Sequence, residues 1–451
     1  MESEGLTAGL ARFVAASPHV ACPPEALQAA KRAFIDTLGV MLAGRGEQAV
    51  MRLDTCLPDG TEATALPGGR RLSAGDAALL GGTAGHVLDY DDVALHGHAS
   101  VVLIPAILAE AQRMSASGLD ALKAYLVGFE VWTELARREP DAYHLGSWHP
   151  TAMLGTVAAT AAVAALARLD EVRTRHALAI AASLASGVIA NFGTHTKPLQ
   201  AGQAAASAVD AARLAGAGIE GAADALESPH GFLIGISPQR RADTRSPVNL
   251  PGEGWRLVTE GVSVKRYPVC YAAHRAVDAV IDLVASAGLS AGDVVRVTVW
   301  LGIAPARTLR YTHPQSGLEA RFSLHHNVAA AFCEGSLGFA HLTDDYVRRP
   351  EVAVLYGLTR MELRDDPCPE QPGLARHDRV VIETRDGCRL DSGDIRYPRG
   401  HAKCPLSDAE VDAKFLDCAA HGRTTDAAAL LESLHDLDRC KSIEELFGHG
   451  L

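Results

Sequence analysis

The chain has 451 residues and a formal net charge of −12 at neutral pH. One hydrophobic core rarely serves so long a chain, so we expect two domains. The acidic balance argues against a nucleic-acid or membrane-surface partner, because either would require a basic face. Hydrophobic residues make up 48% of the chain but aromatic residues only 5%. That composition favours helices packed through small side chains.

Nine cysteines are scattered along the chain, and no two of them form a Cys-x-x-Cys pair. Their spacing therefore gives no indication of a zinc ribbon, a thioredoxin-type site or a cysteine-ligated iron–sulfur cluster. The first residues, Met-Glu-Ser-Glu-Gly-Leu, lack the basic segment and the long apolar segment of a signal peptide. We expect a cytoplasmic protein with reduced thiols.

The first 235 residues have the pattern of a helical bundle. Apolar periodicity predicts two helices between residues 5 and 45, whereas the weak periodicity of residues 46–75 predicts a connecting segment. Further helices are expected over residues 77–84, 101–111, 119–136 and 203–217. Residues 151–167 and 177–192 are nearly uncharged but contain few large apolar groups. They favour helices buried on all sides over membrane spans.

Prolines, arginines and glycines crowd together between residues 236 and 262, and this predicts a domain boundary. A mixed order of helices and strands follows it. The expected elements are a helix at 270–287, a strand at 294–301, a helix at 323–334 and a strand at 379–384. After Pro405 the pattern returns to helix, at residues 407–419, 426–437 and 442–447.

Residues 86–100 are dense in titratable groups. They read His-Val-Leu-Asp-Tyr-Asp-Asp-Val-Ala-Leu-His-Gly-His-Ala-Ser and lie between two apolar, helix-prone runs. Carboxylates and imidazoles are costly to bury unless they pair with each other, with a metal or with a ligand. We therefore expect this stretch to border a polar cavity. A solvated acidic loop between helices is the alternative.

Seven segments together support a family resemblance. They are residues 86–100, 128–132, 148–156, 196–205, 264–279, 317–324 and 405–415. In these segments the sequence resembles the MmgE/PrpD family, which includes 2-methylcitrate dehydratases, cis-aconitate decarboxylases and an iminodisuccinate epimerase. The resemblance implies a mainly α fold with a large all-helical domain, residues 1–260 and 400–451, and a smaller α+β lid domain, residues 261–399.

The resemblance also implies a homodimer, and chemistry on a small polycarboxylate without a metal or an organic cofactor. The leading interpretation is a hydro-lyase similar to 2-methylcitrate dehydratase. Decarboxylation of the cis-aconitate type and epimerisation of the iminodisuccinate type stay open, because all three reactions share a proton transfer next to a carboxylate.

A dianionic or trianionic substrate requires cations to hold it. Lys197 and Lys265 each stand between apolar segments in a matching motif, and the resemblance implies that both bind substrate carboxylates. The other predicted substrate-binding residues are Gln200, Tyr267, Cys270 and His274.

Histidine supplies an acid or a base near neutral pH more readily than other residues. His98 and His149 match positions that the family uses in its active site, and His149 stands at the N-terminal edge of a predicted helix, where an anion is favoured. We predict that both carry protons and that Asp89 orients a histidine or a lysine. His326 is a catalytic candidate as a substitute for a tyrosine of the family.

Four positions depart from the family pattern. This chain has Val93 where a hydroxyl residue often follows Asp-Asp, and Gln200 where a histidine is frequent. It has Cys270 where a histidine can follow Tyr-Pro-x, and His325-His326 where proline and then tyrosine are common. These changes suggest that the substrate is not simply methylcitrate or cis-aconitate.

Two other classes of function stay open. A metallohydrolase could use Asp92, His96 and His98, although no His-Glu-x-x-His or other helical ligand pair supports it. A non-catalytic helical scaffold would have no pocket and would tolerate substitution of His98.

Overall fold

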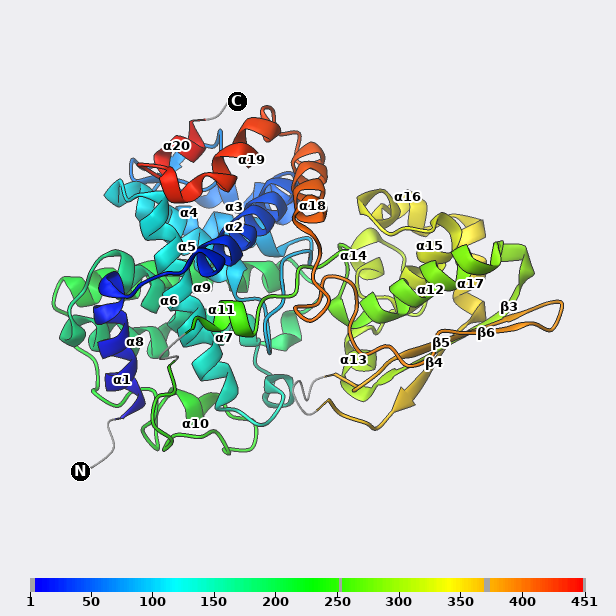
Figure 1. Ribbon diagram of the computed structural model, residues 1–451, viewed down its shortest axis with the longest axis horizontal. Coiled ribbons are helices and arrows are strands. Elements are labelled where there is room, and N and C mark those ends of the chain that lie inside the picture. The colour runs from blue at the N-terminus through cyan, green and yellow to red at the C-terminus, as the bar shows by residue number, and fades with distance from the viewer. Residues whose placement is uncertain (1–4, 251–253, 369–373, 449–451) are drawn as a thin grey trace. The chain divides into compact units, whose positions relative to one another are not determined.

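The computed structural model describes residues 5–250, 254–368 and 374–448. The chain divides into two compact units, which we call unit 1 (residues 1–262 and 407–451) and unit 2 (residues 263–406). Unit 1 is built of helices, whereas unit 2 combines helices with a small sheet (Figure 1). The mainly α fold class that the sequence predicted is confirmed. Within the described ranges, no helix has both the length and the apolar character that a membrane span requires.

Unit 1 contains helices from both ends of the chain. Its N-terminal helices are α1 (Leu6–Ala16), α2 (Pro24–Gly44), α3 (Gln48–Cys56), α4 (Ala74–His86), α5 (Ser100–Met114), α6 (Gly118–Arg137), α7 (Pro150–Leu166), α8 (Glu171–Leu184), α9 (Thr196–Gly216), α10 (Phe232–Ile236) and α11 (Arg256–Thr259). Its C-terminal helices are α18 (Asp408–His421), α19 (Ala427–His435) and α20 (Glu444–Phe447). Both α18 and α19 pack against α2 (Figure 1).

Side-chain caps fix where several of these helices begin. Ser73, Ser117 and Asp170 each accept a hydrogen bond from the backbone N–H three residues further on, which satisfies a donor that the first turn leaves unpaired. At the start of α18, Ser407 and Glu410 form a reciprocal capping box.

Two of the predicted segments differ from the structure. Residues 46–75 are not only a connection, because they form α3 and a short hairpin of β1 (Ala63–Thr64) and β2 (Arg71–Leu72). Residues 151–167 match α7, which is buried on every face as predicted. Residues 177–192 are not one buried helix, because α8 ends at Leu184 and the chain then pairs in extended form, Val188 with Trp148.

Helices α4 and α9 cross where Gly82 faces Gly202. A Cβ atom on Gly82 would lie 2.8 Å from the Cα of Gly202, and one on Gly202 would lie 2.2 Å from the carbonyl oxygen of Leu79. Only glycine allows two backbones to approach so closely. The crossing therefore fixes the position of Lys197 and Gln200, which lie in the first turns of α9.

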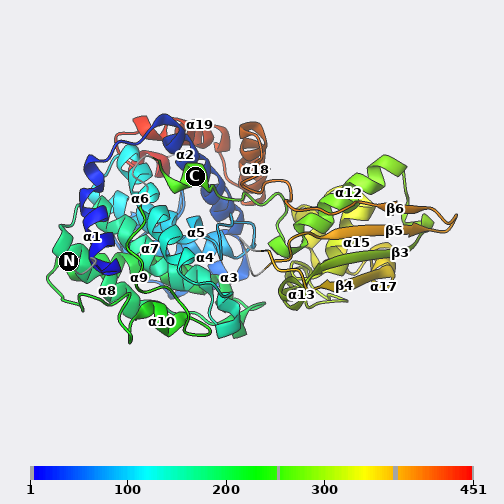
Figure 2. The same ribbon diagram turned by 60° about the horizontal axis from the view of Figure 1, so that its bottom comes forward.

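Unit 2 has a four-stranded sheet in the order β4-β3-β5-β6. Its strands are β3 (Val294–Gly302), β4 (Thr359–Arg364), β5 (Arg379–Thr384) and β6 (Arg389–Asp391). The β3–β4 pair is parallel and the other two pairs are antiparallel. The longer helices α12 (His274–Ala287), α15 (Leu324–Glu334) and α17 (Pro350–Leu358) pack against one face of this sheet, as Figure 2 shows. The short helices are α13 (Ile303–Thr308), α14 (Gly317–Ala320) and α16 (Asp344–Val347).

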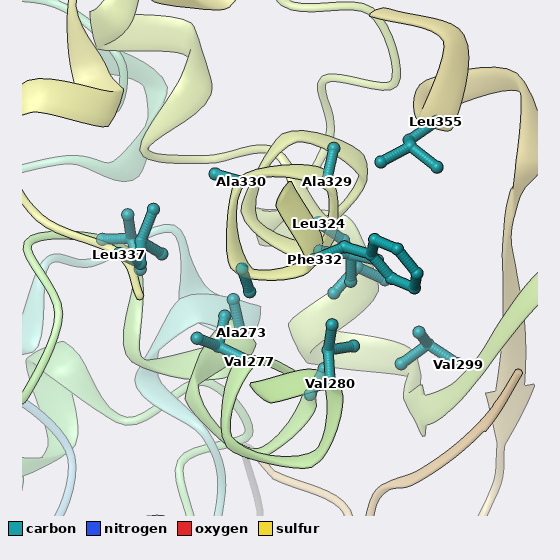
Figure 3. Close-up of a cluster of buried hydrophobic side chains, with 14 of the residues drawn as sticks. Ala273, Val277, Val280, Val299, Leu324, Ala329, Ala330, Phe332, Leu337 and Leu355 are labelled. Atoms are coloured by element: carbon teal, nitrogen blue, oxygen red, sulfur yellow. The ribbon is translucent and has the colours of Figure 1, made fainter. Parts of the chain in front are cut away.

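The core of unit 2 lies between these helices and the sheet. Figure 3 shows Val277 and Val280 of α12 facing Leu324 and Phe332 of α15, with Val299 of β3 beside them, and all five side chains are buried. Removing such side chains from water is the main force that holds helices on a sheet. Unit 2 therefore has a hydrophobic core of its own.

We predict that Gly202→Val destabilises unit 1. The larger side chain would push α4 and α9 apart and should lower the free energy of unfolding by at least ~1–3 kcal/mol, the usual effect of overpacking. Urea unfolding followed by circular dichroism measures it. The matched control is Gly216→Ala on the same helix, whose added Cβ would meet nothing closer than Leu169 Cδ2 at 3.7 Å. Equal stability of Gly202→Val and the wild type would contradict the prediction.

Candidate active site

The titratable run lies in the connection between α4 and α5. Asp89 and Leu95 take left-handed backbone conformations, with φ of 52° and 53°, and an antiparallel bridge joins Ala94 to Gly97. Left-handed residues reverse the chain locally. The connection therefore folds back on itself and returns His98 to the end of α4, where His86 lies.

Asp91 joins His86 and His98. Its Oδ2 atom lies 2.8 Å from Nδ1 of His86 and 3.1 Å from Nδ1 of His98. Burial alone would raise the pKa of Asp91, but the two imidazoles hold this pKa well below its ordinary value. Burial also lowers the pKa of His86 to about 4, against the opposing effect of Asp91. The group therefore contains an ionised carboxylate and, at His86, a neutral imidazole.

Lys197 places a buried cation next to this group. Its Nζ atom donates a hydrogen bond to Oδ1 of Asp89 at 2.5 Å, and both side chains are buried. The same Nζ atom lies 5.4 Å from the centre of the Phe192 ring, within the range of a cation–π contact. The ammonium group is thus held by a carboxylate and by an aromatic face.

His149 is the N-cap residue of α7 and the third histidine of the site. Its ring stacks on His86 with ring centres 5.5 Å apart, and it meets Phe192 edge-on at 4.9 Å. Nδ1 lies 2.8 Å from Oε1 of Gln200. Burial lowers the pKa of His149 well below 6.5, and nearby His86 and Lys197 lower it further. His149 is therefore neutral at physiological pH.

The three histidines differ in how far solvent reaches them. The His98 side chain is 15% exposed, whereas that of His86 is fully buried and His149 as a whole is 2% exposed. Asp91 contacts Nδ1 of His98, and in a hydrolase triad a carboxylate makes the same contact and orients the histidine ring. His98 is thus the histidine best placed to exchange a proton with a bound molecule.

A second polar layer lies beneath this loop. Ser100 donates a hydrogen bond to Asp92 and lies 2.7 Å from the hydroxyl of Tyr125. Burial raises the pKa of Asp92 to about 7, and the nearby carboxylate of Asp36 raises it as well. Asp92 therefore belongs to a buried network and does not point toward the three histidines.

Lys414 of α18 reaches into the same layer. Its Nζ atom lies 2.6 Å from Oδ1 of Asp36 and donates a hydrogen bond to the backbone oxygen of Tyr90 at 2.9 Å. It also lies 3.9 Å from the centre of the Tyr90 ring. Since Tyr90 stands between Asp89 and Asp91, a C-terminal helix braces the loop that carries the site.

The donors considered for a metallohydrolase do not converge. His96 contacts the ring of Tyr143 at 5.2 Å, and Asp92 pairs with Ser100. Among the described residues, the group close enough to share an ion is instead His86, Asp91 and His98, whose ligand atoms lie within 4.8 Å of one another. These donor types suit zinc or iron. The contacts of 2.8 and 3.1 Å also fit direct pairing of the three side chains.

Three predicted site residues of unit 2 lie at or shortly before the start of α12, namely Tyr267, Cys270 and His274. The hydroxyl of Tyr267 donates to Oδ1 of Asp278 at 2.7 Å. His274 lies with its ring centre 5.1 Å from the rings of Tyr267 and Tyr271. Cys270 is buried, and its backbone N–H donates to the carbonyl oxygen of Arg321. Lys265 is fully buried.

His326 lies elsewhere in unit 2, on α15. Nδ1 is 2.8 Å from the hydroxyl of Tyr356, Nε2 is 2.8 Å from the backbone oxygen of His341, and the residue is fully buried. These contacts occupy both ring nitrogens. They favour a structural role for His326 over the proton transfer that the sequence suggested.

Sequence reasoning left His86, Asp91 and Phe192 out of the predicted site. The available signal for the first two was the density of carboxylates and imidazoles in residues 86–100. That density indicates that some groups must pair, but it does not say which, because the pairing depends on the left-handed turn at Asp89. No comparable signal marks Phe192, which lies in a weakly polar segment.

The arrangement in unit 1 has the groups that acid–base chemistry on an anion requires. It combines a histidine backed by a carboxylate (His98), a neutral histidine (His149) and a buried ammonium group (Lys197). A proton donor, a proton acceptor and a cation are what proton transfer next to a carboxylate requires.

Comparison with known proteins places this chain in a family. Residues 8–245 match the MmgE/PrpD N-terminal domain and residues 267–438 match the MmgE/PrpD C-terminal domain. The chain belongs to the MmgE/PrpD family, as the resemblance implied.

Curated relatives indicate the class of reaction. The chain is 30% identical to cis-aconitate decarboxylase of Homo sapiens over 83% of this chain and 80% of the human protein. It is 30% identical to the Mus musculus cis-aconitate decarboxylase over 93% of this chain and 88% of the mouse protein. It is 27% identical to 2-methylcitrate dehydratase of Escherichia coli over 82% of this chain and 81% of that protein. The chain is accordingly a lyase.

We predict that ionisation of Asp92 makes wild-type stability fall as pH rises. A carboxyl group whose folded pKa is raised binds its proton more tightly when folded, so stability declines between the unfolded pKa near 4 and the folded pKa of about 7. Between pH 5 and 8, the free energy of unfolding of the wild type should fall by up to roughly 2–3 kcal/mol relative to Asp92→Asn.

Urea unfolding of both proteins at the two pH values tests this prediction. Asp417→Asn is the control, because Asp417 is exposed on α18. If the difference between wild type and Asp92→Asn does not change with pH, Asp92 is ionised throughout this range and the prediction is refuted.

Proposed function

We propose that this lyase decarboxylates a β,γ-unsaturated polycarboxylate of the cis-aconitate type. The observation that carries the proposal is the juxtaposition of a carboxylate-backed histidine, His98, with the buried cation Lys197. The names of the human and mouse relatives support the same reaction. The sequence-based preference for dehydration becomes the second candidate.

The bond changes of such a decarboxylation are simple. A proton adds to the γ carbon, the double bond moves to the α and β carbons, and the electron pair of the bond between the α carbon and the leaving carboxylate fills the new double bond. Carbon dioxide leaves without charge, whereas the remaining carboxylates keep theirs. The reaction therefore needs an acid at the γ carbon, a cation for the retained carboxylates and a less polar place for the group that leaves.

The residues of unit 1 supply these three requirements. His98 protonates the γ carbon, and Asp91, in contact with Nδ1, orients the ring for that transfer. Lys197 binds a retained carboxylate, which takes a share of the ammonium group now held by Asp89. The leaving carboxyl group lies against Phe192, where partial desolvation raises its pKa. Neutral His149 accepts the proton of that carboxyl group as carbon dioxide leaves. Solvent then removes this proton from His149 and returns one to His98, which restores both groups.

Dehydration is the second candidate because the same pair of histidines suits it. His149 would remove a proton from the carbon next to a carboxylate, and His98 would protonate the departing hydroxyl group. The relative named 2-methylcitrate dehydratase supports this reading. Epimerisation would need the same base and a proton returned to the opposite face of the carbon.

The deciding experiment offers purified protein cis-aconitate, 2-methylcitrate and a panel of other dicarboxylates and tricarboxylates in deuterated water, with products followed by NMR. We expect one carbon dioxide per turnover and one deuteron at the former γ carbon, with the same rate in EDTA.

A new double bond without carbon dioxide would favour dehydration, and deuterium exchange alone would favour epimerisation. Loss of activity in EDTA with recovery on adding zinc would favour a metal at His86, Asp91 and His98. No turnover of any substrate would refute the proposal.

We predict that replacing Lys197 changes mainly KM, whereas replacing His98 or His149 changes mainly kcat. Lys197→Met removes a contact that exists in both the ground state and the transition state, so KM should rise roughly tenfold or more. His98→Gln and His149→Gln should mainly lower kcat, by ~10²–10⁴. Steady-state kinetics on the substrate found above measures both constants.

The control for these variants is Lys123→Met. Lys123 lies on α6 and takes part in none of the contacts described above for the site. Normal kcat in both histidine variants, with intact folding, would show that the proton carrier lies elsewhere, and Cys270 would be the next residue to test.

A further inference from the structure

We infer that Gln200 is a positioning residue that fixes the tautomer of His149. The inference rests on the proposed role of His149 as a base, because a base needs its lone pair on the nitrogen that faces the substrate. It departs from the sequence-based prediction, which gave Gln200 a direct part in substrate binding.

The hydrogen bonds of Gln200 allow one orientation of its amide. Nε2 donates to the backbone oxygen of Val188 at 3.0 Å, and Oε1 lies 2.8 Å from Nδ1 of His149. The reversed amide would place Oε1 against the Val188 oxygen, which is also an acceptor. Since an amide oxygen only accepts, Nδ1 of His149 must carry the hydrogen and Nε2 must carry the lone pair.

The backbone oxygen that accepts from the Gln200 amide belongs to residues 187–189, which pair with the segment that carries His149, residues 147–149. The backbone N–H of His149 donates to the carbonyl oxygen of Gly187 at 3.1 Å, and that of Ile189 donates to the carbonyl oxygen of Ser147 at 3.1 Å. Val188, between them, pairs with Trp148. The oxygen that orients Gln200 is therefore fixed relative to the ring that Gln200 orients.

The titratable groups around the ring do not perform the same task. His86 on α4 stacks on the face of the ring, with ring planes 22° apart, so it does not meet Nδ1 in the ring plane. Lys197 on α9 and Asp89 pair with each other, and Asp91 and His98 of the loop pair with each other. Gln200 is the acceptor that the structure gives to Nδ1.

Position 200 also departs from the family pattern, because an amide stands where the resemblance implies an imidazole. A histidine, which the resemblance places here in many relatives, has its own titration and can act as donor or acceptor. An amide oxygen accepts at any pH. In this chain the His149 tautomer is thus set by a group that does not titrate.

The test begins with a measurement that needs no activity. NMR of protein labelled with ¹⁵N-histidine distinguishes the two tautomers, and His149→Gln identifies the signals of His149 by their absence. We expect the Nδ1–H form in the wild type. Gln200→Met, which keeps the length of the side chain but has no acceptor, should shift His149 toward the Nε2–H form. Gln200→Glu should retain the Nδ1–H form, because it still offers an oxygen.

Kinetics then separates positioning from substrate binding. If Gln200 positions His149, Gln200→Met should lower kcat by roughly 10²-fold, as for a partly lost base, and should change KM by less than about twofold. Gln203→Met is the matched control on the same helix, since Gln203 is exposed and its hydrogen bond within the described part of the chain goes to Ser207, at 3.3 Å. It should change neither the tautomer nor kcat.

The outcomes that overturn the inference differ from those that overturn the proposed function. An Nε2–H form in the wild type, or an unchanged tautomer in Gln200→Met, refutes the inference whatever the substrate proves to be. A changed tautomer with a raised KM and normal kcat refutes the positioning role and restores substrate binding. A changed tautomer in a protein that releases no carbon dioxide from any substrate refutes only the decarboxylase proposal.

Discussion

The site depends on one buried carboxylate, that of Asp91. Taking an ion out of water costs several kcal/mol unless charged or hydrogen-bonding partners compensate it, and here the imidazoles of His86 and His98 do so. To bring both rings to one oxygen the chain must reverse between α4 and α5, which the left-handed conformation of Asp89 accomplishes. The same reversal directs the Asp89 side chain toward Lys197. Charge compensation at Asp91 therefore determines the shape of the whole loop.

The pKa values of two neighbouring carboxyl groups in this loop are shifted in opposite directions. Asp91 has a lowered pKa because two imidazoles face it, whereas Asp92, the next residue, has a raised pKa because burial and Asp36 oppose its ionisation. Environment, not residue type, separates the two. Two adjacent acidic residues of one loop thus supply an anion to the histidines and, at Asp92, a carboxyl group that binds its proton more tightly and lies in the helical core beneath.

The sequence predicted the helices well because their apolar periodicity is local. It also located the loop of the site, since three imidazoles and three carboxylates are costly to bury unpaired. It could not identify the partners, because the pairing of His98 with Asp91 depends on a turn, and that of His149 with Gln200 depends on the packing of α7 against α9. For His326, the family motif suggested catalysis, but the hydroxyl of Tyr356, thirty residues away in sequence, determines the surroundings.

The brace that Lys414 supplies has a consequence for the time course of folding. Lys414 lies 324 residues after Tyr90, whose carbonyl oxygen it binds. At a synthesis rate of ~5–20 residues per second, roughly 15–65 s pass between the synthesis of Tyr90 and that of Lys414. The residues of unit 2 are synthesised during this interval. The buried pair of Lys414 with Asp36 therefore forms only after the residues of unit 2 have been synthesised, so the loop of the site gains this contact later than its other charge pairs.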